Sequence, residues 1–367
     1  MSQTVQTGEK VGDYVVERLI GRGALGEVYL VRRDPGGERF AMKTLLPDVA
    51  EENPEYIQRF VREGRLAMKM RHPNIVAVHD VGYSSERGIY YLVMDYVRGG
   101  DLRAAIAIGG AMEPGEAVRI VASVASALAS GERFGLVHRD IKPENVMIED
   151  DGSVRLVDLG VAKANETDSL HTMSNAVFGT PNYISPEQAS DSSKVDSRAD
   201  VYSLGIVLFE LLTGRRPYDG SNPAEAAVFL FSRKPIPDVR TVNPSVPAPL
   251  ANIIARMCEK RLDRRIASAS ALVEEFRAAG LLNDADQTSR SRVQRRAPED
   301  DSPFDYAAYV DRPANNTLSF DTQDTEIRDF VAKLKARRRR RRIAIAAAVA
   351  AAAAVAVALA ALLFGTG

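Results

Sequence analysis

The stretch His138-Arg139-Asp140-Ile141-Lys142-Pro143-Glu144-Asn145 combines three kinds of chemistry within a single short segment. Asp140 can accept a proton from a hydroxyl, Lys142 can neutralise a moving phosphate, and Asn145 can hold a magnesium ion through its amide. Together these side chains indicate the transfer of a phosphoryl group to an alcohol. No common structural element needs this order of residues, so chance does not account for the match.

A glycine-rich segment lies upstream, where Gly21, Gly23 and Gly26 are followed by Val28. A glycine hairpin lets backbone amides approach phosphates without obstruction by side chains. Dinucleotide-binding folds use a similar spacing, and a plain β-turn would also suit these residues. Here the glycines lie between two strand-like segments and not between a strand and a helix, which favours a phosphate-covering hairpin.

These segments resemble a known family, the bacterial eukaryotic-like (Hanks-type) serine/threonine protein kinases, in a single-pass membrane form. The resemblance covers about residues 14–275, and Lys142 resembles the serine/threonine branch. It implies ATP and Mg2+ as cofactors, with Mn2+ as an alternative metal, and proteins as substrates. It also implies a protein-kinase-like fold of two lobes.

The resemblance assigns a role to each matching position. Asp140 and Lys142 would be catalytic, and Asn145 and Asp158 would bind the metal. The positions implied to bind the nucleotide are Gly21, Gly23, Gly26, Val28, Ala41, Lys43, Glu63, Asp95 and Val97.

Lys43 would grip the phosphates and pair with a glutamate of the next helix, for which Glu63 is the candidate. The other acids nearby, Glu51, Glu52 and Glu55, fall at or before the start of that helix. Acids at such positions interact favourably with the helix dipole, so they have a simpler explanation.

The segment from Asp158 to Glu187 resembles an activation segment. The family usually has Phe after the aspartate, whereas this chain has Leu159, which leaves open the balance between aspartate-in and aspartate-out states. Thr172 and Ser174 are the expected regulatory phosphosites, although loop hydroxyls are often merely solvated. The arginine before the catalytic aspartate would pair with a phosphorylated loop residue.

Five positions would support the site without touching the reacting atoms: Arg139, Thr180, Glu187, Asp200 and Arg265. Thr180 would contact the catalytic aspartate and lysine. Asp200 would hold the backbone of the catalytic loop at the start of a helix. Arg265, or with less support Arg264, would pair with Glu187.

The order of the predicted elements indicates an α+β fold of two lobes. Strand-like residues dominate 14–95, with one helix that Asn53-Pro54 opens, and this part is expected to form an antiparallel sheet lobe. Long apolar-periodic stretches at 115–134, 201–213 and 248–258 predict a mainly helical lobe over 99–280. The whole kinase domain would span 14–280, after a tail at 1–13.

The C-terminal part has a different composition. Residues 283–336 are rich in polar residues and predict a flexible linker, six arginines follow at 337–342, and residues 343–364 carry no charge. That length can cross a hydrocarbon core of ~30 Å as a helix, and the arginines would place the kinase domain at the cytoplasmic face of the cell membrane. An alanine-rich soluble helix or a low-complexity tail is the alternative interpretation. The arginines either bind anionic lipids or only orient insertion.

Composition limits the other function classes. With 48 basic and 49 acidic side chains the chain has no general affinity for nucleic acid, and its single cysteine, Cys258, suits a reducing compartment. The leading hypothesis is a membrane-tethered serine/threonine kinase that autophosphorylates its activation loop, in trans within a homodimer. The alternative is a catalytically silent pseudokinase scaffold, but none of the catalytic positions is lost. A small-molecule kinase is disfavoured because 180–187 resembles a peptide-docking loop.

Overall fold

The computed structural model describes residues 4–23, 26–46, 54–132, 134–158, 182–190, 195–218, 228–232 and 234–282. Several predictions fall outside these ranges, namely those on Leu159, Thr172, Ser174, Thr180, the linker, the arginine run and the transmembrane helix. Among the helices of the described ranges, none has both the length and the apolar character that a membrane crossing requires.

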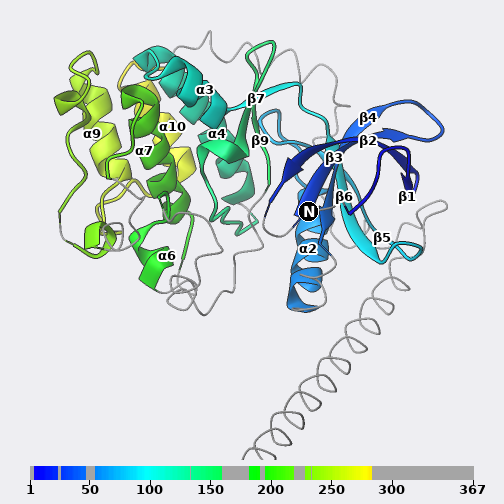
Figure 1. The fold of residues 1–367 in the computed structure, drawn as a ribbon. Coiled ribbons are helices and arrows are strands. Elements are labelled where there is room, and N and C mark those ends of the chain that lie inside the picture. The colour runs from blue at the N-terminus through cyan, green and yellow to red at the C-terminus, as the bar shows by residue number, and fades with distance from the viewer. Residues whose placement is uncertain are drawn as a thin grey trace, which may run out of the picture. The chain divides into compact units, whose positions relative to one another are not determined.

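The first lobe is built on one antiparallel sheet, as predicted (Figure 1). Its strands are β1 (Lys10–Val11), β2 (Tyr14–Arg22), β3 (Gly26–Arg33), β4 (Arg39–Leu45), β5 (Val78–Ser84) and β6 (Ile89–Asp95). Their order in the sheet is β1-β2-β3-β4-β6-β5. Each strand pairs with antiparallel neighbours only, which fits short connections between consecutive strands.

Successive side chains of a strand point to opposite faces of the sheet. Because apolar residues occupy consecutive positions here, both faces of this sheet are apolar. Tyr29 and Val31 of β3 belong to one buried cluster, and Val28 packs against a second cluster that contains Ala41 and Val97. The second cluster lies on the face that carries Lys43, since Lys43 and Ala41 are two residues apart on β4. A nucleotide at Lys43 would therefore meet an apolar surface.

The residues before 14, predicted only as a tail, form part of this lobe. Strand β1 pairs with β2, and Val5 is fully buried in the cluster of Tyr29 and Val31. A segment this short shows no periodic pattern of apolar residues. The sheet lobe therefore begins earlier than expected.

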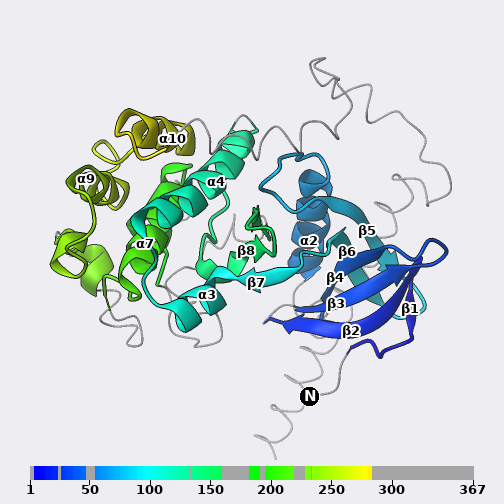
Figure 2. The same cartoon turned by 90° about the horizontal axis from the view of Figure 1, so that it is seen from above.

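Helix α2 (Pro54–Ala67) is the predicted helix that follows β4 in the chain, and Figure 2 shows it beside the strands of the lobe. A Cβ atom on Gly64 would lie 2.4 Å from a methyl carbon of Val81 and 3.0 Å from one of Leu92. Glycine at this position therefore permits close packing on β5 and β6. Because Glu63 directly precedes Gly64, this close packing also sets the position of Glu63 relative to β5 and β6.

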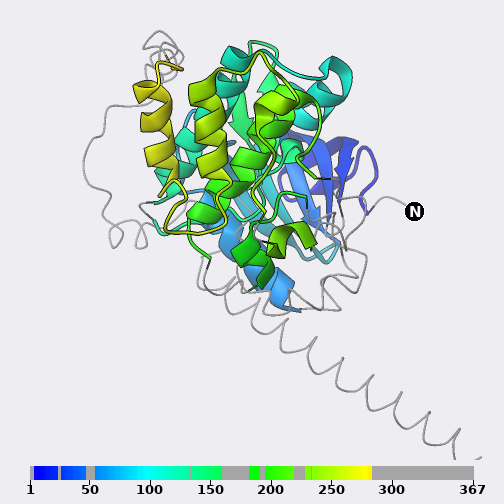
Figure 3. The same ribbon diagram turned by 90° about the vertical axis from the view of Figure 1, so that its left-hand side faces the viewer.

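The second lobe is helical. Its helices are α3 (Leu102–Gly109), α4 (Pro114–Glu132), α6 (Pro186–Ser190), α7 (Arg198–Thr213), α9 (Ala248–Met257) and α10 (Ala269–Ala278). Residues 199–212 of α7 are all buried, as expected for a helix that is apolar around its whole circumference. Helix α7 contacts α4, α9 and α10. Figure 3 shows the helical lobe from another side. The predicted helices over 115–134, 201–213 and 248–258 are confirmed as α4, α7 and α9.

A small second sheet lies at the junction of the two lobes. The sequence predicts its last strand, because residues 154–157 are strand-like, but it does not predict the other two. The sheet consists of β7 (Gly99–Asp101), β8 (Val146–Glu149) and β9 (Val154–Leu156), in that order. Strands of this length carry too few residues for a recognisable period of two. The sheet matters because β8 follows the catalytic loop and β9 leads into Asp158.

Candidate active site

The stretch 138–145 forms a compact loop that brings three predicted residues together. Lys142 Nζ lies 2.9 Å from Asp140 Oδ2. Asn145 Nδ2 donates to the backbone oxygen of Asp140 at 2.7 Å and to its Oδ2 at 3.1 Å. A short 3-10 helix over Pro143–Asn145 sets this spacing. The Asp140 carboxylate is thereby oriented by a cation and an amide.

The loop backbone is held in an unusual conformation by one buried acid. Arg139 has a φ of 63°, which is uncommon for a residue with a side chain. The N–H groups of His138 and Arg139 donate to the two carboxylate oxygens of Asp200 at 2.7 and 2.8 Å. Asp200 starts α7 and is only 3% exposed. It therefore fixes the backbone from which Asp140 projects, in the place expected for it.

The electrostatics of Asp200 reflect this buried position. Burial raises the pKa of Asp200 to about 7, while the bonds from the His138 and Arg139 amides and the charge of Arg139 lower it. Because both carboxylate oxygens accept backbone N–H bonds, the geometry suits the ionised form.

Asp158 lies beside this loop at the end of the small sheet. The Val157 N–H donates to the Asn145 carbonyl at 2.9 Å, so the backbones before Asp158 and at Asn145 are directly joined. Asp158 itself has a φ of 53°. Non-glycine residues in this region concentrate at functional sites, where the surrounding structure holds them. The two predicted metal ligands thus come from neighbouring backbone segments.

Lys43 of β4 reaches Asp158 from the other lobe, with 2.8 Å between its Nζ and Asp158 Oδ1. Burial lowers the pKa of Lys43, but the carboxylates of Asp158, Glu63 and Asp140 outweigh burial and raise it. The ammonium is therefore charged and lies in the field of three predicted site residues. Glu63, the predicted partner of Lys43, therefore acts on it through its charge.

Three of the predicted nucleotide-binding glycines lie where β2 ends and β3 begins. Gly21 lies near the end of β2, Gly23 follows that strand, and Gly26 begins β3. The Gly23 N–H donates to the Gly26 carbonyl at 2.8 Å, which closes the hairpin base. A Cβ on Gly26 would lie 2.0 Å from the Thr44 carbonyl oxygen, so only glycine permits this approach to β4. Val28 pairs in register with Lys43.

Asp95 ends β6, and Val97 lies in the connection between the lobes. Asp95 Oδ1 lies 2.6 Å from His79 Nε2, and burial raises its pKa less than the bond and charge of His79 lower it. Because the Asp95 carboxylate already binds His79, a contact between Asp95 and a nucleotide would have to come from the Asp95 backbone. Val97 is buried in the cluster that contains Ala41.

The donor set of the site fits Mg2+. Because Asn145 Nδ2 is bound to two oxygens of Asp140, its Oδ1 is the amide atom that would bind a cation, and Asp158 would add a carboxylate. Both are the hard oxygen ligands that Mg2+ prefers. Within the described ranges, no group of three or more His, Cys, Asp or Glu side chains could hold a metal. Two protein ligands plus phosphate oxygens and water are a common arrangement for Mg2+.

Glu187 and Arg265 form a buried ion pair beneath the site. Arg265 Nη1 and Nη2 lie 2.6 and 3.1 Å from the two oxygens of Glu187, and the Arg265 side chain is 0% exposed. Arg265 also donates to the carbonyls of Glu259 and Arg198. Arg264 is exposed and makes none of these contacts. The pair ties α6, which begins at the end of the predicted activation segment, to the core of the helical lobe.

We expect Arg265→Met to lower the free energy of unfolding by about 3–5 kcal/mol, because it leaves the Glu187 carboxylate buried without its guanidinium. Arg264→Met is the matched control, with an expected change of about 0.5 kcal/mol or less. Chemical denaturation of both variants measures the difference. Equal losses in the two variants would contradict this role for Arg265.

A second network beside the loop was not predicted. Arg103 of α3 donates to Glu144 Oε1 at 3.0 Å and to Glu210 Oε1 at 2.8 Å, and it also contacts the Tyr183 hydroxyl. That hydroxyl donates to Glu210 Oε2 at 2.5 Å. The network joins α3, the catalytic loop, α7 and the end of the activation segment. Its members are far apart in the chain, so no local spacing could have revealed it.

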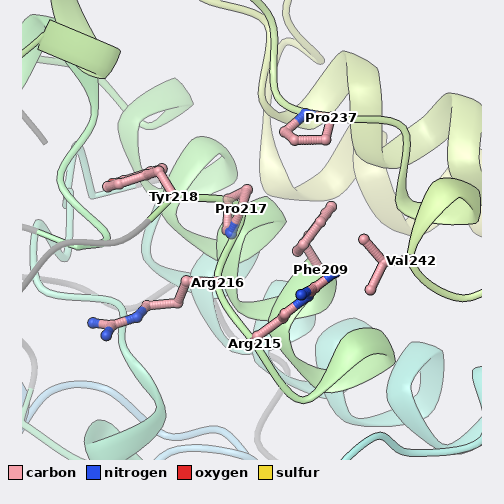
Figure 4. A pocket seen from close by; sticks show the side chains of 7 residues that line it. All are labelled: Phe209, Arg215, Arg216, Pro217, Tyr218, Pro237 and Val242. Atoms are coloured by element: carbon pink, nitrogen blue, oxygen red, sulfur yellow. The ribbon is translucent and has the colours of Figure 1, made fainter. Parts of the chain in front are cut away.

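A cavity of about 380 Å³ lies elsewhere in the helical lobe, beyond the end of α7 (Figure 4). Its lining residues are Phe209, Arg215, Arg216, Pro217, Tyr218, Pro237 and Val242. None of them is a predicted site residue, so this cavity is separate from the catalytic centre.

Comparison with known proteins agrees with the geometry. Residues 14–277 match the family model of the protein kinase domain. The chain is 37% identical to serine/threonine-protein kinase PrkC of Bacillus subtilis over 79% of this chain and 43% of that protein. It is 35% identical to serine/threonine-protein kinase PknB of Mycobacterium leprae over 75% of this chain and 46% of that protein.

The fold is also similar to a solved structure. The PknI kinase domain of Mycobacterium tuberculosis superposes with a TM-score of 0.60 at 28% identity, over 75% of this chain and 99% of that one. The present chain spans less than half the length of the two curated relatives named above.

Proposed function

Because the chain belongs to the protein kinase domain family, we propose that it is an ATP-dependent serine/threonine protein kinase. One observation carries this proposal: Lys43, Asp158, Asn145, Asp140 and Lys142 are linked by contacts of 2.7–3.1 Å or by a shared backbone bond. The names of the relatives support the choice of serine and threonine as acceptors.

Each residue has a distinct part in this chemistry. Mg2+, held by Asn145 and Asp158, would neutralise charge on the ATP phosphates. Lys43 would hold the phosphates against the glycine hairpin. Asp140 would orient the acceptor hydroxyl and take its proton as the new oxygen–phosphorus bond forms and the bond to ADP breaks. Lys142, next to Asp140, would offset the charge of the phosphoryl group in transfer.

The test of this function is phosphotransfer from γ-labelled ATP in the presence of Mg2+. Peptides that carry serine, threonine or tyrosine as their single acceptor should be labelled on serine and threonine only. Labelling of tyrosine alone, or of a small alcohol in preference to every peptide, would contradict the assignment. A pseudokinase scaffold would bind ATP without labelling any acceptor, but the intact set of charged residues argues against it.

The same activity would act on the chain itself. Burial lowers the pKa of Arg139, with the charge of Asp200 opposing this effect. A half-buried guanidinium next to the catalytic aspartate would be stabilised by a nearby phosphate, which supports autophosphorylation at Thr172 or Ser174. Phosphopeptide mapping of the active protein should find one of these sites occupied. We propose that one copy of the chain phosphorylates the other, in trans.

Residues 337–364 would tether the kinase to the cytoplasmic face of a membrane. The support is compositional: an uncharged apolar stretch follows a run of arginines. A chain that ends at Lys333 should stay in the supernatant when membranes are sedimented, whereas the full chain should sediment with them. If the shortened chain still sedimented with carbonate-washed membranes, the tether would lie elsewhere.

A further inference from the structure

The glycine hairpin has an outer face, opposite the face that carries Lys43. Val28 points to the face of Lys43, so its neighbours Glu27 and Tyr29 point to the opposite face. Glu27 is nevertheless 4% exposed, which is unusual for a carboxylate at the edge of a hairpin. It lies directly across from Arg22 on β2 and from Thr44 on β4. Another part of the chain must therefore cover it.

The N-terminal segment covers Glu27 on this face. The Thr4 N–H donates to Glu27 Oε2 at 2.9 Å, and the Tyr29 hydroxyl donates to the same oxygen at 2.5 Å. The Val5 N–H in turn donates to the Tyr29 hydroxyl at 3.0 Å. The side chain of Val5 is fully buried in the adjacent apolar cluster. Residues 4 and 5 are thus fixed to β3 by two hydrogen bonds and one buried side chain.

The second oxygen of Glu27 reaches across the hairpin. Its Oε1 lies 3.0 Å from Arg22 Nε, and Arg22 stands between Gly21 and Gly23. Burial raises the pKa of Glu27, but hydrogen bonds from Tyr29 and Thr4 and the charge of Arg22 outweigh it and lower that pKa. One ionised carboxylate therefore joins the N-terminal segment to the two strands that carry the glycines. Hydrogen bonds to an ionised carboxylate are charge-assisted and therefore strong, and both oxygens of Glu27 take part in such contacts.

We propose that Thr4–Val5, Glu27 and Tyr29 form an N-terminal brace that positions the glycine hairpin over the ATP phosphates. Glu27 is a positioning residue in this account: it acts on the nucleotide through Arg22 and through its neighbour Val28, which lies opposite Lys43. Gly26 transmits the constraint, because its backbone approaches the Thr44 carbonyl too closely for any side chain. The inference rests on the proposed kinase activity and adds a determinant of nucleotide affinity to it.

The test compares Glu27→Gln with Glu38→Gln, an exposed acid in the turn between β3 and β4. Glu27→Gln places an amide group against donors from Thr4, Tyr29 and Arg22, so we expect the KM for ATP to rise about tenfold. The value of kcat should change by about twofold or less, because Asp140 and Asp158 are not touched. Glu38→Gln should leave both constants unchanged.

Deletion of residues 2–6 should raise the KM for ATP as Glu27→Gln does, and the two changes combined should raise it no further. Tyr29→Phe, which keeps the buried ring, should give a smaller rise in the same direction. Unchanged KM values in Glu27→Gln and in the deletion would overturn the brace. A fall in kcat with no change in KM would also overturn it.

Binding of a fluorescent ATP analogue separates this inference from the proposed function. If the wild-type chain binds the analogue but labels no acceptor, the kinase assignment fails. The affinity for the analogue then still tests the brace. In that case Glu27→Gln should weaken the binding about tenfold. It should also speed amide hydrogen exchange over residues 19–28. Equal affinity and equal exchange in the wild type and in Glu27→Gln would contradict the brace.

Discussion

Asp140→Asn is expected to lower the rate of phosphotransfer by about 10²–10⁴-fold, the range for loss of a general acid–base group. The amide cannot accept the hydroxyl proton, and it no longer offers a charge to Lys142, whose Nζ lies 2.9 Å from Asp140 Oδ2. The affinity for ATP should stay close to the wild-type value because Lys43 and Asp158 are intact. Steady-state kinetics and nucleotide binding, measured side by side, check both parts.

Asp150→Asn is the matched control for this change. Asp150 is an exposed acid in the turn between β8 and β9, a few residues beyond the catalytic loop. The same substitution there should leave the rate unchanged. If Asp150→Asn slowed the reaction as much as Asp140→Asn, the loss would reflect net charge and not the position of the carboxylate.

Asp158→Asn should reduce the rate by roughly 10³-fold, since metal-assisted stabilisation of transition-state charge is worth several kcal/mol. It should also raise the Mg2+ concentration needed for half-maximal rate, because one of the two predicted protein ligands loses its charge. The substitution removes the carboxylate that lies 2.8 Å from Lys43 Nζ. The pKa of Lys43 should therefore fall, since burial lowers it and Asp158 is the first of the carboxylates that raise it.

A titration of the rate with Mg2+ in the wild type and in Asp158→Asn measures this effect. The two enzymes should reach half-maximal rate at clearly different Mg2+ concentrations. An unchanged Mg2+ midpoint together with a reduced rate would show that Asp158 acts on Lys43 alone and does not bind the metal.

Much of the fold followed from local patterns. The strands β2, β3 and β4 and the helices α4, α7 and α9 were predictable because each is long enough to show its period of apolar residues. Strands of two or three residues, such as β1 and β7, were not, because a period cannot be read from so few positions. Short elements owe their structure to pairing with neighbours rather than to their own sequence.

The site shows the same division. Motif spacing found Asp140, Asn145 and Asp158, because the chemistry requires those residue types in that order. It missed Arg103, whose partner Glu210 lies 107 positions away along the chain. It also missed Glu27, which looked like an ordinary charged residue in a strand. Its burial follows from the N-terminal segment that covers it, and only the folded structure brings the two together.

Phosphoamino-acid analysis of the wild-type chain and of Asp140→Asn, each incubated with γ-labelled ATP and Mg2+, tests the central claim most directly. The wild type should carry label on serine and threonine. Asp140→Asn, at equal protein and with equal ATP binding, should carry almost none. Label on both proteins in equal amounts, or on neither while ATP is bound, would contradict phosphoryl transfer at this site.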